Sequence, residues 1–158
     1  MHHPYFGDID LEEDFAELPT IQSAQGEILV EIDAADRHPT MNELDGLATA
    51  CKSHDVWTAK VLEQARTDYE DLLFDALSVW GGDDPTLLKQ FNPDATSVAD
   101  VTAEQAVSKL KLVEIRMEVS DPAEIAFDLH FDLNEENHYL VCGRFECDGT
   151  LSDVTLES

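Results

Sequence analysis

Basic residues are scarce in this chain. Its 158 residues include 35 Asp and Glu but only 9 Lys and Arg, which gives a formal net charge of -26 and a sequence pI near 4.1. Proteins that bind phosphates with a basic face need clustered Lys and Arg, so the composition excludes nucleic-acid binding of that kind. It excludes adhesion to an anionic membrane surface for the same reason. The acidic surface expected of this protein favours a basic partner, because complementary charge speeds the encounter of two proteins.

Cysteine, glycine and proline are also few. With 7 Gly and 6 Pro the chain is not collagen-like. Cys51, Cys142 and Cys147 form no disulfide framework and match no zinc-ligand spacing, so we expect reduced, inert thiols. No apolar run approaches the ~18 residues needed to span a bilayer, and the opening Met1–Pro4 has no signal-peptide character. The expected location is therefore the cytoplasm, with no membrane contact.

Catalytic motifs are absent as well. The sequence holds no G-x-S-x-G, P-loop, G-x-G-x-x-G, H-E-x-x-H or C-x-x-C pattern. Its densest acidic segment, residues 8–14, starts like a calcium loop but places Glu13 and Pro19 where an EF-hand needs Gly and Glu. We therefore expect a protein that is not an enzyme and that holds no cofactor or metal.

What the chain does contain is enough apolar material for a core. Hydrophobic residues make up 43% of it, and its length fits a single domain, residues 1–158. Alternation predicts strands over residues 5–11 and 27–33, and a weaker edge strand over residues 15–21 that Pro19 interrupts. The amino-terminal part is thus predicted to be β-sheet.

Helical spacing takes over in the middle of the chain. Thr40 with Glu43, and Thr102 with Gln105, form capping boxes of the kind that start helices. The first box opens one helix, and a long second helix is predicted over residues 56–80. The other box opens a short helix after an irregular segment, residues 83–101, in which a short helical turn fits residues 86–91.

Alternation returns in the last third of the chain. Strands are predicted over residues 113–119, 125–133, 139–145 and 154–156. The order of strands, helices and strands predicts an α+β fold, in which a mainly antiparallel sheet has two to three helices packed on one face and its other face wet. His130 lies between Asp128 and Asp132 on the face expected to be exposed. There it can act as a general base or a metal ligand, or only soften repulsion between the acids.

The two ends of the chain resemble a known family. The segment His3–Leu11, with its His-Pro-Tyr-Phe-Gly opening, is similar to the first strand of a set of small bacterial domains of unknown function. The segment Asn134–Val141 and the Asp148-Gly149 turn are similar to the family's ending. Such domains often lie near toxin systems and are suspected immunity proteins. The resemblance therefore implies neutralisation of a toxin, and it implies no catalytic residues.

Charge is distributed unevenly along the chain. Residues 1–36 contain no Lys or Arg, and residues 117–158 contain only Arg144. The first hypothesis is therefore a non-catalytic acidic binding protein that blocks a basic partner, such as a nuclease toxin, by electrostatic complementarity. We expect the contacts to come from exposed acids of the terminal strands. These are Asp8, Asp10, Glu12, Glu13, Asp128, Asp132, Glu135 and Glu136.

Two further hypotheses stay open. One is a small enzyme with a metal- or His-centred site around His130. The other is a housekeeping domain of a salt-adapted bacterium, whose acids serve only to hydrate it. Salt adaptation predicts acids spread evenly over the surface, and the uneven charge distribution counts against it.

Overall fold

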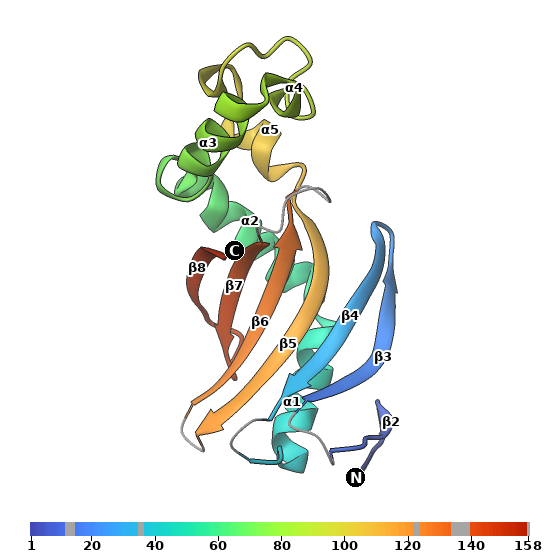
Figure 1. Ribbon diagram of the computed structural model, residues 1–158. Coiled ribbons are helices and arrows are strands. Elements are labelled where there is room, and N and C mark those ends of the chain that lie inside the picture. Colours follow the sequence, from blue (N-terminus) through green and yellow to red (C-terminus); the bar gives the residue numbers. More distant parts are fainter. Residues whose placement is uncertain (12–14, 35–36, 122–123, 134–139, 158) are drawn as a thin grey trace.

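A six-stranded sheet forms the centre of the protein, whose structure is a computed structural model that describes residues 1–11, 15–34, 37–121, 124–133 and 140–157. The strands are β3 (Phe15–Ser23), β4 (Gly26–Asp33), β5 (Lys111–Asp121), β6 (Glu124–Asp132), β7 (Leu140–Glu146) and β8 (Leu151–Glu157). Their order in the sheet is the order in the chain (Figure 1). β3 is an edge strand, as Pro19 predicts, and its pairing with β4 shifts register between Leu18 and Ile21.

The fold is α+β, but the sheet is mixed rather than mainly antiparallel, which corrects the prediction from the sequence. β4 and β5 run parallel, with Val30 opposite Ile115, whereas the other strand pairs of this sheet are antiparallel. The helices between β4 and β5 bring the chain back to the end of the sheet where β4 began, and a long crossover of this kind permits parallel pairing. Alternation within one strand carries no information about the direction of its neighbour.

The chain begins with a small hairpin, so the strand predicted over residues 5–11 is wrong. β1 (His2–His3) pairs with β2 (Gly7–Asp8) in a separate two-stranded sheet. Phe6 and Ile9 are buried and anchor the hairpin to the core. The apolar side chains that suggested a strand are therefore buried because they anchor the hairpin to the core, and this does not require an extended backbone.

The middle of the chain holds more helices than the two to three predicted. Five α-helices occur among the described residues: α1 (Met41–Lys52), α2 (His54–Thr67), α3 (Asp75–Asp83), α4 (Pro85–Leu88) and α5 (Ala103–Val107). A π-helical turn (Glu70–Phe74) and a 3-10 turn (Val98–Asp100) lie between them. Within the part of the chain that the structure describes, no helix combines the length and the apolar character needed to cross a membrane.

Two local features account for the extra helices. The long helix predicted over residues 56–80 is interrupted after α2, although Ala65, Tyr69 and Leu73 stay buried on both sides of the break. A periodicity argument misses such a break because the same side of the chain remains apolar throughout. In the segment predicted to be irregular, the Asp84 side chain accepts a hydrogen bond from the Thr86 backbone and so caps α4.

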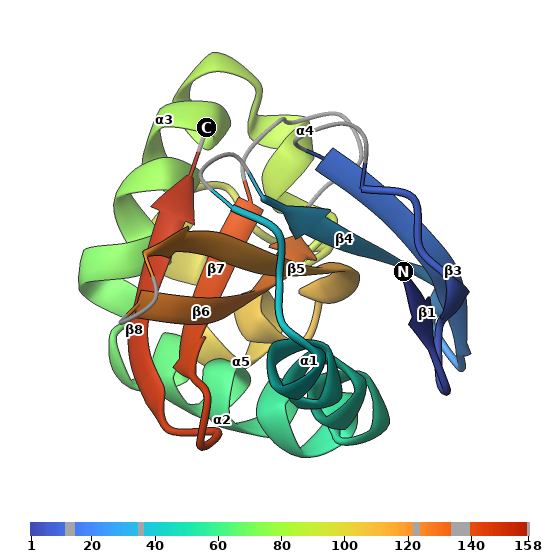
Figure 2. The same cartoon turned by 90° about the horizontal axis from the view of Figure 1, so that it is seen from below.

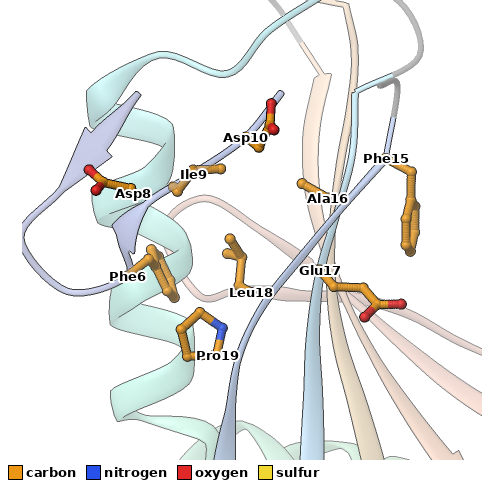
Figure 3. A pocket seen from close by; sticks show the side chains of 9 residues that line it. All are labelled: Phe6, Asp8, Ile9, Asp10, Phe15, Ala16, Glu17, Leu18 and Pro19. Carbon is orange, nitrogen blue, oxygen red and sulfur yellow. The ribbon is translucent and has the colours of Figure 1, made fainter. Parts of the chain in front are cut away.

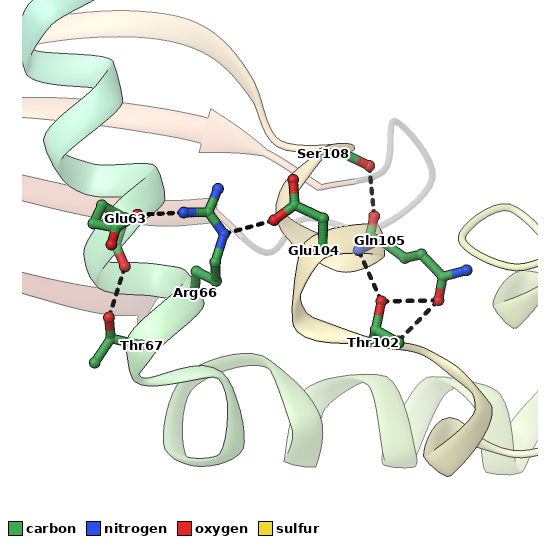
Figure 4. Close-up of polar contacts among 7 residues, drawn as sticks. All are labelled: Glu63, Arg66, Thr67, Thr102, Glu104, Gln105 and Ser108. Atoms are coloured by element: carbon green, nitrogen blue, oxygen red, sulfur yellow. Dashed lines mark hydrogen bonds and ion pairs between the residues drawn. The ribbon is translucent and has the colours of Figure 1, made fainter.

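Both predicted capping boxes are present. The box at residues 40–43 starts α1, and Thr102 with Gln105 starts α5 (Figure 4). Nearby, Arg66 on α2 donates from Nε to Glu104 of α5 at 2.7 Å, so an ion pair links two helices that are distant in sequence. The caps are local in sequence, which is why they could be predicted, whereas this ion pair could not.

The apolar core lies between the sheet and the first two helices. α1 and α2 run along one face of the sheet, and α3 to α5 lie beyond one end of the strands (Figures 1 and 2). Trp57 of α2 stacks on the fully buried Phe145, with ring centroids 4.5 Å apart. Gly143 of β7 permits a close approach of α2, because a Cβ at this position would overlap the Val61 side chain. The opposite face of the sheet carries mostly polar side chains, with Phe15 and Leu29 as exposed apolar residues at its β3–β4 side.

Candidate functional site

A row of charged side chains crosses the sheet on the face opposite α1 and α2. From β3 to β8 it consists of Glu17, Glu31, Arg116, Asp128, Arg144 and Asp153, each in register with the next. From β4 onward the sign of the charge alternates. Side chains directly opposite on neighbouring strands interact, so the row stabilises the register of the sheet and fixes its own members in place.

Ion pairs hold the centre of this row. Arg144 donates from Nε and Nη2 to the two carboxylate oxygens of Asp128 at 2.9 and 2.8 Å, and from Nη2 to Glu118 at 2.5 Å. The hydrogen bond with Asp128 is the main reason why the pKa of Arg144 is raised above its usual value. Arg116 pairs with Glu31 at 3.2 Å. Such bidentate and charge-assisted contacts are stronger than neutral hydrogen bonds.

Beside the charged row, Glu114, His130 and Cys142 lie next to one another on β5, β6 and β7. They are 9%, 4% and 3% exposed. His130 Nδ1 lies 3.3 Å from Glu114 Oε1, and Arg116 Nε lies 2.7 Å from the same oxygen, but neither contact has hydrogen-bond geometry. The potential ligand atoms of Asp128, His130 and Cys142 all lie within 4.8 Å of one another.

Burial and charge shift several pKa values in this region. Burial raises the pKa of Glu31, and the adjacent Glu114 raises it further. Burial alone would raise the pKa of Glu114, but His130 and Arg116 outweigh it and leave that pKa lowered. Burial also raises the pKa of the Cys142 thiol, and nearby carboxylates add to this effect. The thiol is therefore protonated at neutral pH and is not a ready nucleophile.

The prediction that Asp128 and His130 are exposed is wrong. Both lie on β6, a central strand, where they are 5% and 4% exposed. Neighbouring side chains on β5 and β7, such as Glu114 and Arg144, lie against them. Alternation identified the correct face of the strand, but it could not show that this face is crowded by charged partners.

An acidic groove lies where the amino-terminal hairpin meets the edge strand β3. Its volume is about 510 Å³, and its lining is formed by Phe6, Asp8, Ile9, Asp10, Phe15, Ala16, Glu17, Leu18 and Pro19 (Figure 3). Asp8 and Asp10 come from the hairpin and the segment after it, and Glu17 comes from β3. Phe15 is 41% exposed. The groove thus combines an apolar lining with carboxylates from two segments, and Glu17 joins it to the charged row.

The structure brings together only part of the predicted contact set. Asp8 and Asp10 both line the groove and are exposed. Asp132 is half-buried on the polar sheet face, away from the groove, and opposite Lys111. Asp128 is buried and bound to Arg144, so it offers no contact to a partner. Glu12, Glu13, Glu135 and Glu136 lie outside the described residues.

Sequence reasoning missed Glu17, Phe15 and Glu114. The signal was present only in part: Phe15 and Glu17 have the same parity on a predicted edge strand, so they share one sheet face. The groove that they line together with Asp8 depends on the hairpin, which was predicted as a strand. The position of Glu114 beside His130 can be recognised only when the pairing of β5 with β6 is known.

The cysteines are free thiols, as expected from their spacing. Cys51 and Cys142 are buried, and Cys147 is exposed. Burial raises the pKa of each thiol, for Cys51 to about 12. None has the lowered pKa that typifies a reactive cysteine.

Comparison of the chain with protein-family models, with curated proteins and with solved structures finds no match. The resemblance of the chain's two ends to small bacterial domains therefore stays a prediction.

Proposed function

We propose that this protein is a non-catalytic binding protein whose acidic groove receives a basic segment of a partner protein. The groove carries the proposal, because Asp8 and Asp10 line it from the amino-terminal segment and Glu17 lines it from β3. It lies in a protein with a net charge of -26, whose field attracts cations from a distance. Lys and Arg side chains have the charge and the apolar stems that such a lining accommodates.

Exposed apolar side chains lie at the groove and on the adjoining strand: Phe15 lines the groove, and Leu29 lies on β4. Phe15 and Leu29 are 41% and 47% exposed and lie on the same face of β3 and β4. Large exposed apolar side chains beside charged ones are typical of protein interfaces, where a buried aromatic anchor supplies affinity. Charge complementarity would then supply a fast association rate and selection against acidic proteins.

Within this proposal, the partner is a toxin and the protein is its immunity protein. Two observations favour this version: the excess of carboxylates and the resemblance at the ends of the chain. A nuclease binds phosphates through clustered Lys and Arg, so its active-site cleft is a surface that this groove complements. Covering that cleft blocks the enzyme without any catalytic step by the inhibitor.

Affinity capture from the native cell tests the proposal with three matched baits. One bait is the unmodified protein, and a second carries Asp8→Asn, Asp10→Asn and Glu17→Gln. The third removes three charges from exposed acids of the helical region, away from the groove: Glu70→Gln, Asp75→Asn and Asp94→Asn. We expect the first and third baits to retain a basic protein that high salt elutes, and the second to lose it.

The purified partner then gives the decisive comparison. Its association rate with the unmodified protein should fall steeply as salt is added. An association rate that does not change with salt, or a groove variant that binds the partner as well as the unmodified protein does, contradicts the proposal. So does the failure of the unmodified bait to retain any basic protein.

A further inference from the structure

Three potential metal ligands meet on the polar face of the sheet, away from the groove. Asp128 and His130 project from the same side of β6, and Cys142 lies opposite His130 on β7. Their carboxylate, imidazole and thiol atoms all lie within 4.8 Å of one another. The three residues are 5%, 4% and 3% exposed. Two adjacent central strands therefore hold three different donor groups in a site shielded from water.

This donor set matches one class of ion. Thiolate and imidazole select borderline divalent transition metals such as Zn²⁺ over Mg²⁺ and Ca²⁺, which prefer oxygen ligands. Around a tetrahedral zinc ion, ligand atoms lie about 3.5 Å apart, as follows from bond lengths of about 2.0–2.3 Å. Metal binding therefore requires side-chain rotations that contract the cluster from its present separation of up to 4.8 Å.

The surroundings of His130 provide an independent observation. His130 Nδ1 is buried and lies 3.3 Å from Glu114 Oε1, yet neither atom has a hydrogen-bond partner among the described residues. Buried polar groups without such partners are uncommon. In metal sites, a ligating histidine typically donates its other ring N–H to a carboxylate. Glu114 stands where that carboxylate would stand if His130 bound a metal through Nε2.

The local charge also favours a cation. Three buried acids, Glu31, Glu114 and Asp128, lie beside two partly exposed arginines, Arg116 and Arg144. A divalent ion bound here would add positive charge among these buried carboxylates and so offset their mutual repulsion. Asp128 can keep its bonds to Arg144 while it binds a metal, because each carboxylate oxygen has more than one acceptor site.

We propose that Asp128, His130 and Cys142 bind a divalent transition-metal ion of the zinc class, with Glu114 as a positioning residue. The Cys142 thiol transfers its proton to solvent as the metal–sulfur bond forms, so no oxidant or reductant is needed. Three protein ligands leave one position of a tetrahedral ion for water or another small ligand. The site does not depend on the proposed partner.

Metal titration of the chelator-treated, reduced protein tests this directly. Calorimetry with Zn²⁺ should show one ion bound per chain. Absorption spectroscopy with Co²⁺ should show a thiolate-to-cobalt charge-transfer band and the visible bands of tetrahedral cobalt. A cobalt complex without the thiolate band overturns the proposal, and this readout needs no variant.

Variants assign the ligands. His130→Ala and Cys142→Ser should each weaken zinc binding by at least about 100-fold. Glu114→Gln should weaken it by about tenfold and keep the thiolate band, since outer-shell partners orient the ligand without binding the metal. The controls Cys147→Ser and His2→Ala change an exposed thiol and an exposed imidazole elsewhere, and they should leave binding unchanged. Loss of binding in the controls, or its persistence in His130→Ala and Cys142→Ser, overturns the site.

Because no partner enters these assays, their failure leaves the acidic groove and its proposed role untouched. Should His130→Ala or Cys142→Ser fold poorly, alkylation of Cys142 in the unmodified protein replaces them. Zn²⁺ should slow that alkylation, while alkylation of Cys147 should continue unchanged. Equal rates at Cys142 with and without Zn²⁺ contradict the proposal.

Discussion

Replacement of Arg144 by Met should destabilise the protein because it leaves a buried carboxylate without its partner. Asp128 is 5% exposed and accepts two hydrogen bonds from Arg144. Breaking a fully buried ion pair from one side costs about 3–5 kcal/mol. The Arg144 side chain is 48% exposed, so water reaches its end of the pair and lowers the cost. We therefore expect a loss of about 2 kcal/mol, which for a chain of this size lowers the Tm by about 4–8 °C.

A double-mutant cycle measured by urea unfolding checks this value. Asp128→Asn should relieve much of the destabilisation caused by Arg144→Met, because the double variant no longer buries an unpaired charge. Arg66→Met is the matched control, since its partner carboxylates on Glu63 and Glu104 are 71% and 73% exposed. Exposed pairs contribute about 0–1 kcal/mol. Equal effects of Arg144→Met and Arg66→Met, or strictly additive effects in the cycle, would refute the assignment of a buried pair.

Other predictions concern packing, capping and pH. Gly143→Ala should destabilise the protein by about 1–3 kcal/mol through overlap with Val61, and Val61→Ala should partly rescue it in thermal unfolding; an unchanged Tm for Gly143→Ala argues against this close approach. Thr40→Ala should cost about 1 kcal/mol in chemical unfolding by removal of the α1 cap, and no loss contradicts the capping box. The hydrogen bond from Arg37 lowers the pKa of Glu43 below its unfolded value. The ionised Glu43 side chain therefore contributes to the free energy of unfolding above the unfolded pKa, and this contribution is lost as pH falls through the folded pKa. Glu43→Gln should therefore destabilise the protein at pH 7 but should be as stable as the unmodified protein in acid. A loss of stability that persists in acid counts against this linkage.

The sequence predicted best what depends on near neighbours. The capping boxes at Thr40 and Thr102 are present because each forms within four residues, whatever the rest of the chain does. Apolar positions of β5 to β7 such as Met117 and Phe127 are buried as alternation predicted, whereas Val113 and Ile125 are half-buried. The edge position of β3 followed from Pro19, which cannot donate to a neighbouring strand.

What the sequence could not predict depends on pairing between distant segments. The parallel contact of β4 with β5 arises from the crossover through the helices. Burial of His130 requires Glu114 and Cys142 on the strands to either side, and their register is not encoded in one strand's pattern. The groove likewise requires β3 to lie beside the amino-terminal hairpin, and only two of the predicted contact acids, Asp8 and Asp10, line it.

The most direct test of the central claim is the association rate of the captured partner with the three matched proteins at low and high salt. The unmodified protein and the variant with charges removed at Glu70, Asp75 and Asp94 should associate at similar rates. The groove variant, changed at the acids that line the groove, should associate at least about tenfold more slowly at low salt, with much of the difference lost at high salt. Equal slowing of both charge-removal variants would show that net charge alone attracts the partner, and equal rates for all three would show that the carboxylates play no part.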